Sequence, residues 1–353
     1  MQQRVIISQD IEHDLAQAIA ETEHDRVFVL TDDITQECCL PKVAPLLTKH
    51  NATTITIRHD DTNKTLATLT DVWTALQRGG ATRHSLLVNL GGGMVTDLGG
   101  FAAATFKRGI NFINIPTTLL AMVDAAVGGK TGINFGGLKN EVGAFANARY
   151  VIVNTCFLDT LDTANLCSGY AEMLKHSLIS NAQMWAEHVN FDILQPDLAE
   201  LQRMVAASIA VKERIVADDP HEHGIRKALN FGHTVGHALE EFSMQQSTPP
   251  GTLLHGYAVA FGLIGELYIS ARKAGFPTAR LHQTARFIRE NYGAAAFTCD
   301  DYPTLLNLMR HDKKNTSDTI NFTLLHDIGD IRINQTATDE EIREALDFIR
   351  EGY

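Results

Sequence analysis

The chain has few cysteines, and their number and spacing argue against a disulfide framework. The five are Cys38, Cys39, Cys156, Cys167 and Cys299, an odd number that contains no Cys-x-x-Cys pair. Small secreted domains carry paired cysteines, whereas cytosolic proteins keep their thiols reduced. We therefore expect free thiols and a cytoplasmic location.

Long apolar segments are also missing. The N-terminal residues MQQRVIISQD lack the apolar stretch of a signal peptide. The longest apolar run, Ala258 to Ile269, contains Glu266 and is too short to span a bilayer. We therefore expect neither a secretory leader nor a membrane-spanning helix.

The chain has fewer basic than acidic residues. The chain has 30 Lys and Arg residues against 42 Asp and Glu residues, a formal net charge of −12. A negative field disfavours nucleic acid and anionic membranes as partners. An anionic small-molecule substrate would therefore need a local cluster of basic residues.

What the sequence does contain is a strand–helix alternation followed by a helical half. With 353 residues, of which 44% are hydrophobic, the chain is long enough for two domains. The alternation predicts a parallel, Rossmann-like sheet. The predicted strands are Arg4–Ser8, Arg26–Thr31, Thr53–Arg58, Ser85–Leu90, Asn111–Ile115 and Tyr150–Asn154.

After Cys156 the pattern becomes mainly helical, with a late β pair at Thr319–Leu325 and Asp330–Asn334 and a last helix at Asp339–Arg350. The fold class predicted is α/β. Residues 1–156 would form the Rossmann-like domain and residues 157–353 a mainly α-helical domain.

A glycine-rich turn follows the fourth predicted strand. Gly91, Gly92 and Gly93 precede a helical segment that contains Asp97. Glycines between a strand and a helix let the backbone approach a pyrophosphate at the helix N-terminus. Tight strand-to-helix turns also need glycine for steric reasons alone, so both interpretations stay open.

A second glycine-rich stretch, Ile115 to Ala146, is predicted as a strand end, a short helix up to Asp124 and a loop. Lys130, Lys139 and Asn140 project from this loop. The glycine spacing does not fit a P-loop. A flexible, solvated loop explains the glycines but not the concentration of Lys and Asn.

Histidines gather between Leu229 and Tyr257. His233 and His237 are spaced i, i+4, which places them on one helix face, and His255 opens the next apolar run. Glu172, among apolar residues, could complete a Glu–His–His site for a divalent metal. The alternatives are histidines packed in the core and an exposed ion pair of Glu172 with Lys175.

Seven motifs carry a resemblance to a known family. They are GGGMVTD, IPTTLLAMVDAAVGGKTGIN, LKNEVGAF, SGYAEMLKH, LNFGHTVGHALE, LHGYAVAFG and HDKKN. In this order, between about Asp32 and Asn315, they resemble the 3-dehydroquinate synthases among the sugar-phosphate cyclases. The resemblance implies an N-terminal NAD-binding domain, a C-terminal helical domain that binds metal and substrate, and a cytoplasmic homodimer.

The resemblance also implies roles for individual residues. Glu172, His233 and His255 would bind Zn²⁺ or Co²⁺, so that His237 is not a ligand. His237 would instead face the substrate and transfer protons with Glu222, and Lys175 would be a further catalytic residue.

Two larger sets follow from the same resemblance. NAD would contact Asp32, Asp61, Lys64, Gly91, Gly92, Gly93, Asp97, Thr117, Thr118, Lys139, Phe157 and Thr160. Substrate would contact Asp124, Lys130, Asn140, Lys175, Lys212, Arg226, Asn230, His237, one of Lys313 and Lys314, and Arg108 from the second subunit.

One departure from the family pattern is visible. The family has Asp-Gly-Glu-x-x-Lys after its third strand, where this chain has His59-Asp60-Asp61-Thr62-Asn63-Lys64. Asp61 keeps a carboxylate that is one methylene shorter. The difference concerns the contacts to the adenosine side of NAD and not the reaction.

The reaction implied is the conversion of 3-deoxy-D-arabino-heptulosonate 7-phosphate to 3-dehydroquinate and phosphate, a step of the shikimate pathway. The substrate would be a phosphorylated sugar acid. Another sugar-phosphate cyclase is the first alternative, and an NAD- and metal-dependent polyol dehydrogenase is the second. A non-catalytic NAD-binding protein would not need both the metal ligands and the lysines.

Overall fold

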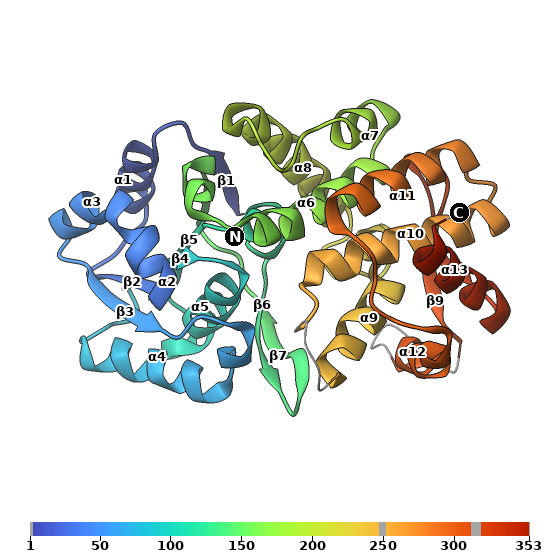
Figure 1. The fold of residues 1–353 in the computed structure, drawn as a ribbon. Coiled ribbons are helices and arrows are strands. Elements are labelled where there is room, and N and C mark those ends of the chain that lie inside the picture. The colour runs from blue at the N-terminus through green and yellow to red at the C-terminus, as the bar shows by residue number, and fades with distance from the viewer. Residues whose placement is uncertain (1–2, 247–251, 312–318, 353) are drawn as a thin grey trace. The chain divides into compact units, whose positions relative to one another are not determined.

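The computed structural model describes residues 3–246, 252–311 and 319–352 (Figure 1). The chain forms two compact units. The first comprises Met1–Asp162 and Asp197–Ile209, and the second comprises Thr163–Pro196 and Ala210–Tyr353. The predicted boundary after residue 156 separates an NAD-binding domain from a metal- and substrate-binding domain. The two units are defined by compactness and not by ligand binding, so this boundary stays a prediction.

The first unit is built on a six-stranded sheet in the order β1-β8-β5-β4-β2-β3, and all of its neighbouring strands pair in parallel. The predicted Rossmann-like sheet is thereby confirmed. Its strands are β1 (Arg4–Ile7), β2 (Val27–Asp32), β3 (Thr53–Ile57), β4 (Leu86–Gly91), β5 (Asn111–Pro116) and β8 (Tyr150–Val153).

The inner strands β2 and β4 are buried at every position, as continuous apolar runs in a parallel sheet require. The connecting helices are α1 (Ile11–Glu21), α2 (Asp33–Cys38), α3 (Ala44–Lys49), α4 (Leu66–Arg78) and α5 (Gly93–Thr105). Short helical turns are η1 (Leu40–Lys42), η2 (Asp61–Asn63), η3 (Phe106–Arg108), η4 (Ala121–Ala125) and η5 (Thr155–Thr160).

The sheet has a topological switch between β2 and β4. The chain adds β3 on one side of β2 and then returns to place β4 and β5 on the other. In open α/β sheets, ligands bind at the carboxyl ends of the two strands where this reversal occurs. Asp32 ends β2 and Gly91 ends β4, so the predicted glycine turn lies at the switch.

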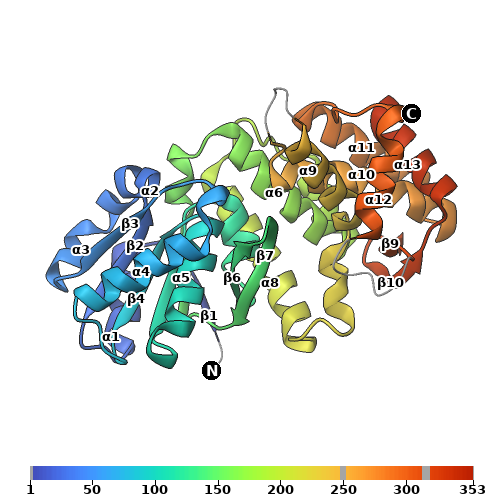
Figure 2. The same cartoon turned by 90° about the horizontal axis from the view of Figure 1, so that it is seen from below.

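The prediction of a glycine-rich loop after Asp124 is wrong, because most of this segment is β-structure. The segment forms a two-stranded antiparallel ribbon of β6 (Lys130–Phe135) and β7 (Leu138–Phe145), which packs against α5 (Figure 2). Its glycines are needed for close strand contact, because a Cβ on Gly143 would lie 2.1 Å from the carbonyl oxygen of Thr131. Glycine therefore marked a ribbon and not a loop.

The second unit is mainly helical. Its helices are α6 (Thr163–Leu178), α7 (Ala182–Val189), the end of α8 (Leu198–Asp218), α9 (His233–Gln245), α10 (His255–Lys273), α11 (Thr278–Tyr292), α12 (Tyr302–Arg310) and α13 (Asp339–Glu351). It also has the turns η6 (Ile225–Asn230) and η7 (Cys299–Asp301) and the antiparallel pair β9 (Asn321–Asp327) and β10 (Asp330–Thr336). The predicted β pair and last helix are confirmed.

Helix α10 is the central helix of this unit and contacts α6, α9, α11 and α13. Most of its residues from Gly256 to Ser270 are buried, which explains the apolar run seen in the sequence. None of the helices in the described ranges is long and apolar enough to cross a membrane.

Candidate metal centre and nucleotide turn

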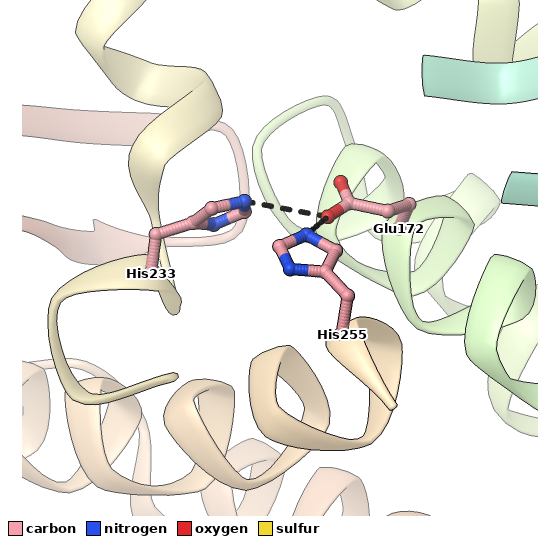
Figure 3. Close-up of side chains that lie close together, drawn as sticks. All are labelled: Glu172, His233 and His255. Carbon is pink, nitrogen blue, oxygen red and sulfur yellow. Dashed lines mark ion pairs between the residues drawn. The ribbon is translucent and has the colours of Figure 1, made fainter. Parts of the chain in front are cut away.

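Three helices of the second unit bring together a carboxylate and two imidazoles (Figure 3). Glu172 comes from α6, His233 begins α9 and His255 begins α10. Oε1 of Glu172 lies 3.3 Å from Nε2 of His233 and 3.5 Å from Nε2 of His255. The residues predicted as metal ligands therefore point their potential ligand atoms at one place.

Glycines allow the three helices to approach this closely. A Cβ on Gly256 would lie 1.8 Å from the carbonyl oxygen of Ser168, so α10 touches the backbone of α6. A Cβ on Gly262 would lie 1.9 Å from the carbonyl oxygen of Gly232, where α9 begins. Because no side chain fits at either contact, the backbones approach until Glu172 faces both histidines.

Glu172 is fully buried and charged. Burial by itself raises the pKa of Glu172, but the Lys175 ammonium and the His233 ring outweigh it and hold that pKa well below its usual range. Lys175 Nζ forms an ion pair with Glu172, and both side chains are inaccessible to solvent. The alternative of an exposed Glu–Lys pair is therefore excluded.

The two histidines present the same ring nitrogen to Glu172. Nδ1 of His233 lies 3.1 Å from the carbonyl oxygen of Phe231, and Nδ1 of His255 lies 3.0 Å from Oε2 of Glu240. Burial lowers the pKa of His255, but the carboxylates of Glu172 and Glu240 outweigh it and raise the pKa to about 10.

The arrangement fits a small divalent cation. Ligand atoms around a tetrahedral Zn²⁺, with bonds of about 2.05 Å, are separated by about 3.3 Å. The separations of 3.3 and 3.5 Å between Glu172 Oε1 and the two Nε2 atoms are close to this edge length. Both carboxylate oxygens of Glu172 are buried and accept no hydrogen bond of normal geometry from the described part of the chain. Two imidazoles and one carboxylate also leave a fourth position open, as catalytic zinc sites do.

His237 lies beside this group. Its ring centroid is 5.2 Å from that of His233 and 6.0 Å from that of His255. The predicted placement of His233 and His237 on one helix is confirmed, because α9 begins at His233 and continues to Gln245. His237 is adjacent to the three candidate ligands without belonging to that group.

A tight turn after α8 carries more of the predicted residues. The carboxylate of Asp219 accepts hydrogen bonds from the backbone N–H groups of His223, Gly224 and Arg226, at 3.0, 2.6 and 3.1 Å. Within this turn, Nδ2 of Asn230 donates to Oε1 of Glu222 at 2.7 Å. The turn therefore places Glu222, Arg226 and Asn230 in one small region.

Three cations of the second unit are buried. Lys175, Lys212 and Arg226 have relative exposures of 1%, 6% and 3%. The guanidinium of Arg226 donates to the carbonyl oxygen of Pro220 at 2.6 Å. Buried cations form strong, charge-assisted hydrogen bonds, so these three side chains are candidates for binding an anionic ligand.

In the first unit, the glycine turn leads directly into α5. The N-cap residue Gly92 offers no side-chain cap, so the first N–H groups of α5 are not used by a capping side chain. A Cβ on Gly91 would lie 2.6 Å from the side chain of Val95. The steric reason for glycine therefore holds at Gly91, while the helix N-terminus retains the features of an anion site.

A buried lysine links two of the predicted sets. Lys64 Nζ lies 2.5 Å from Oδ2 of Asp97 and 2.5 Å from Oδ1 of Asn140. Asp61, which stands where the family has Glu, accepts a hydrogen bond from Asn134 at 3.1 Å and lies 3.7 Å from Lys139 Nζ. The predicted NAD and substrate residues of this unit thus meet through Lys64.

The remaining predicted residues of the first unit are more scattered. Asp32 caps α2 through Thr35, and Phe157 is buried in η5, which also contains Thr160. The other positions are Thr117 and Thr118 after β5, Asp124 in η4, Lys130 at the start of β6 and Arg108 in η3. Lys313 and Lys314 lie outside the described residues.

The sequence reasoning missed three residues that hold this site in place. They are Asp219, Glu240 and Glu266, and each carboxylate accepts from backbone N–H groups or lies against a candidate ligand. The only available signal was Glu266, a charge inside the longest apolar run.

Comparison with known proteins identifies the family. A family model described as 3-dehydroquinate synthase N-terminal matches residues 54–168, and one described as 3-dehydroquinate synthase C-terminal matches residues 169–315. A 3-dehydroquinate synthase of Parabacteroides distasonis is 52% identical over 352 residues, which cover 100% of this chain and 99% of the relative.

Solved structures show the same fold at lower identity. A 2-deoxy-scyllo-inosose synthase in complex with carbaglucose-6-phosphate, NAD⁺ and Co²⁺ has a TM-score of 0.83 and 23% identity, covering 99% of this chain and 96% of that chain. A 2-epi-5-epi-valiolone synthase from Streptomyces hygroscopicus with NAD⁺ and Zn²⁺ has a TM-score of 0.82 and 24% identity, covering 98% and 96%. The two family matches and the full-length relative lead to one conclusion: the chain belongs to the 3-dehydroquinate synthase family.

Proposed function

We propose that the protein is a 3-dehydroquinate synthase, a lyase that converts 3-deoxy-D-arabino-heptulosonate 7-phosphate to 3-dehydroquinate and phosphate. The substrate's C5 alcohol is oxidised, phosphate leaves by β-elimination, C5 is reduced again, and the ring opens and recloses by an intramolecular aldol reaction. The steps need a hydride acceptor that is regenerated, a Lewis acid, proton transfer and binding of two anionic groups.

The observation that carries the proposal is the convergence of Glu172, His233 and His255 in a member of this family. These three residues would hold Zn²⁺ or Co²⁺. When bound, the metal supplies a Lewis acid and NAD supplies a reversible hydride acceptor. NAD- and metal-bound structures of the same fold support both cofactors.

The buried cations of the second unit would bind the negative charges of the substrate. The side chains of Lys175, Lys212 and Arg226 are shielded from water. Because water screens their charge less there, a hydrogen bond from any of them to a phosphate or carboxylate would be stronger than at the surface. Asn230, fixed by Glu222, offers a polar contact. Oriented binding of both ends of one substrate favours the intramolecular steps.

His237 is the candidate for moving protons. It lies beside the two candidate ligand histidines and stays partly exposed, so a bound substrate could reach it. Imidazole exchanges protons near neutral pH. Glu222, in the same unit, is assigned as its partner in proton transfer on the strength of the family resemblance.

NAD would be bound by the first unit. Its pyrophosphate would lie against the turn of Gly91, Gly92 and Gly93, at the uncapped start of α5. The further candidates are Asp32, Asp61, Lys64, Asp97, Thr117, Thr118, Lys139, Phe157 and Thr160. Asp124, Lys130 and Asn140, with Lys313 or Lys314, would complete the substrate contacts.

We further propose a cytoplasmic homodimer in which Arg108 serves the active site of the second subunit. Lys107, Arg108 and Gly109 have positive φ angles of 50°, 69° and 112°, which holds this exposed turn in a conformation that non-glycine residues rarely adopt. Light scattering tests the dimer, and full activity of an Arg108→Ala variant would refute the role of Arg108.

The decisive experiment measures phosphate release from 3-deoxy-D-arabino-heptulosonate 7-phosphate with substoichiometric NAD and added Zn²⁺ or Co²⁺. Absorbance of NADH is followed in the same sample. Many turnovers without lasting NADH are expected, and Glu172→Gln should abolish them. Absence of phosphate release from folded, metal-loaded protein would refute the proposal.

Two alternatives have their own outcomes in this assay. Turnover of sedoheptulose 7-phosphate or glucose 6-phosphate in place of the proposed substrate would identify another sugar-phosphate cyclase. Net accumulation of NADH with glycerol would identify a polyol dehydrogenase, because such an enzyme does not return the hydride.

A further inference from the structure

Two buried carboxylates near the candidate metal centre have no place in the proposed reaction. Glu240 on α9 is 5% exposed and Glu266 on α10 is 0% exposed. Neither belongs to the group of potential ligand atoms around Glu172. Burying a carboxylate is unfavourable unless it is hydrogen-bonded, so each needs a structural or functional reason.

Glu240 acts on the side chain of His255. Its Oε2 lies 3.0 Å from Nδ1 of His255. Because an ionised carboxylate only accepts hydrogen bonds, Nδ1 carries a proton, which leaves Nε2 as the ring nitrogen that can bind a cation. Nε2 is the atom that faces Glu172 at 3.5 Å. A carboxylate behind a histidine ligand fixes the tautomer and the ring orientation in metal sites.

Glu266 acts on the backbone around His233. It accepts from the N–H groups of Gly232, Thr234 and Val235 at 2.7, 2.9 and 3.2 Å. These N–H groups open α9, whose own N-cap residue provides no side-chain cap. The backbone is therefore held on both sides of His233, which itself donates from Nδ1 to the carbonyl oxygen of Phe231.

The two supports are reciprocal. Helix α9 begins with His233 and supplies Glu240 to His255, whereas α10 begins with His255 and supplies Glu266 to the start of α9. The helices are in contact where Gly262 meets the carbonyl oxygen of Gly232, so neither can shift without breaking a carboxylate contact.

We propose that Glu240 and Glu266 are positioning residues that hold His255 and His233 in the geometry for a divalent cation without contacting it. The inference rests on the proposed metal site. It deepens that proposal, because it makes metal affinity depend on two residues outside the ligand group.

The test measures Zn²⁺ and Co²⁺ affinity of the metal-free full-length protein by competition with a chelator, together with the visible absorption of bound Co²⁺. The variants are Glu240→Gln and Glu266→Gln, with Glu241→Gln as the matched control. Glu241 is exposed and adjacent to Glu240, so this control removes the same charge from the same helix. Glu172→Gln reports loss of the site itself.

We expect Glu240→Gln and Glu266→Gln to weaken metal affinity by about 10- to 100-fold, as loss of such supporting residues does elsewhere, and to change the Co²⁺ spectrum. Glu241→Gln should bind as the unmodified protein does. Thermal unfolding of the metal-free variants separates folding from binding. If Glu266→Gln does not fold, Glu240→Gln alone decides.

Wild-type affinity and an unchanged Co²⁺ spectrum in both variants, with only a lower melting temperature, would overturn the inference and leave the proposed function intact. Metal binding that Glu172→Gln does not weaken would overturn the metal site itself. The two failures are thus distinguishable.

Discussion

The most specific mechanical prediction concerns Gly256, the second residue of α10. Replacing it with Ala adds one methyl group where α10 meets α6. The new Cβ would lie 1.8 Å from the carbonyl oxygen and 2.4 Å from the carbonyl carbon of Ser168. Both are backbone atoms, which cannot rotate away as a side chain can. Gly256→Ala therefore has to push the two helices apart.

The displacement can be worked out from the contact. The separation must rise from 1.8 Å to beyond 3.0 Å, a movement of more than about 1.2 Å. His255 precedes Gly256, and Glu172 lies one helical turn after Ser168, so the change acts directly on a ligand-atom separation of 3.5 Å. Metal sites tolerate deviations of only about 0.2 Å. We expect metal affinity to fall at least about tenfold, and overpacking to cost about 1–3 kcal/mol of stability.

Chelator competition gives the affinity, and thermal unfolding with and without Zn²⁺ gives the stability. Gly265→Ala is the matched control on α10, because its Cβ would meet the terminal Cδ1 of Ile349 at 2.9 Å, and that side chain can move. Wild-type metal affinity in folded Gly256→Ala would refute the reasoning that this backbone contact sets the ligand geometry.

Three further predictions follow from the same contacts. The pKa of His255 is raised to about 10, so its protonated ring contributes stability to the metal-free fold that is fully present below about pH 6.5 and is lost as the pH rises through about 10. Because a metal ligand must be deprotonated, metal binding at pH 7.5 should release a proton from His255. Calorimetry in HEPES and Tris checks this, and equal apparent enthalpies would contradict it. Lys64→Met should weaken NAD binding and lower the free energy of unfolding by about 1–3 kcal/mol, because it removes the buried ammonium that contacts the Asp97 carboxylate. Calorimetric titration with NAD tests this, with Lys49→Met at the exposed end of α3 as the control. Equal NAD affinity of the two variants would contradict the prediction. Asp219→Asn should lower kcat/KM about tenfold or more, because an amide cannot accept all three N–H groups that fix the turn before Arg226. Burial raises the pKa of Asp219, but those N–H groups outweigh it and keep the pKa below 3.8. The stability that the ionised Asp219 gives the turn is therefore present above pH 3.8 and is lost as the pH falls through the lowered pKa. Unchanged kinetics of Asp219→Asn at pH 7.5 would rule out that Asp219 positions this turn for catalysis.

Much of the fold was predictable because local sequence patterns report burial. The six strands of the sheet are short runs rich in residues that favour β-structure, and β2 and β4 are buried at every position, as their apolar composition indicated. The spacing of His233 and His237 placed both on one helix, and α9 begins at His233. For Glu172 among apolar residues the sequence left two possibilities, a buried ligand and an exposed ion pair with Lys175, and the structure shows that the carboxylate is buried.

The β6–β7 ribbon could not be predicted in the same way. Its strand β7 is mostly exposed, so it lacks an apolar periodicity, and its glycines imitate a loop. What makes it a ribbon is the backbone contact of Gly132 and Gly143 between the two strands, with a register shift after Ile133. A contact between backbones leaves only glycine in the sequence, and glycine is compatible with both structures.

By itself, the sequence determined the parallel sheet and the helical second half, since these depend on the side chains and their spacing along the chain. The candidate ligands Glu172, His233 and His255 came from the resemblance of the sequence motifs to a known family. Only the tertiary structure decided that Glu240 lies behind His255 and that Glu266 holds the start of α9, because these pairs join separate helices. Their partners are ring nitrogens and backbone N–H groups whose positions follow from how α6, α9 and α10 pack through glycine. No periodicity along the chain encodes that packing.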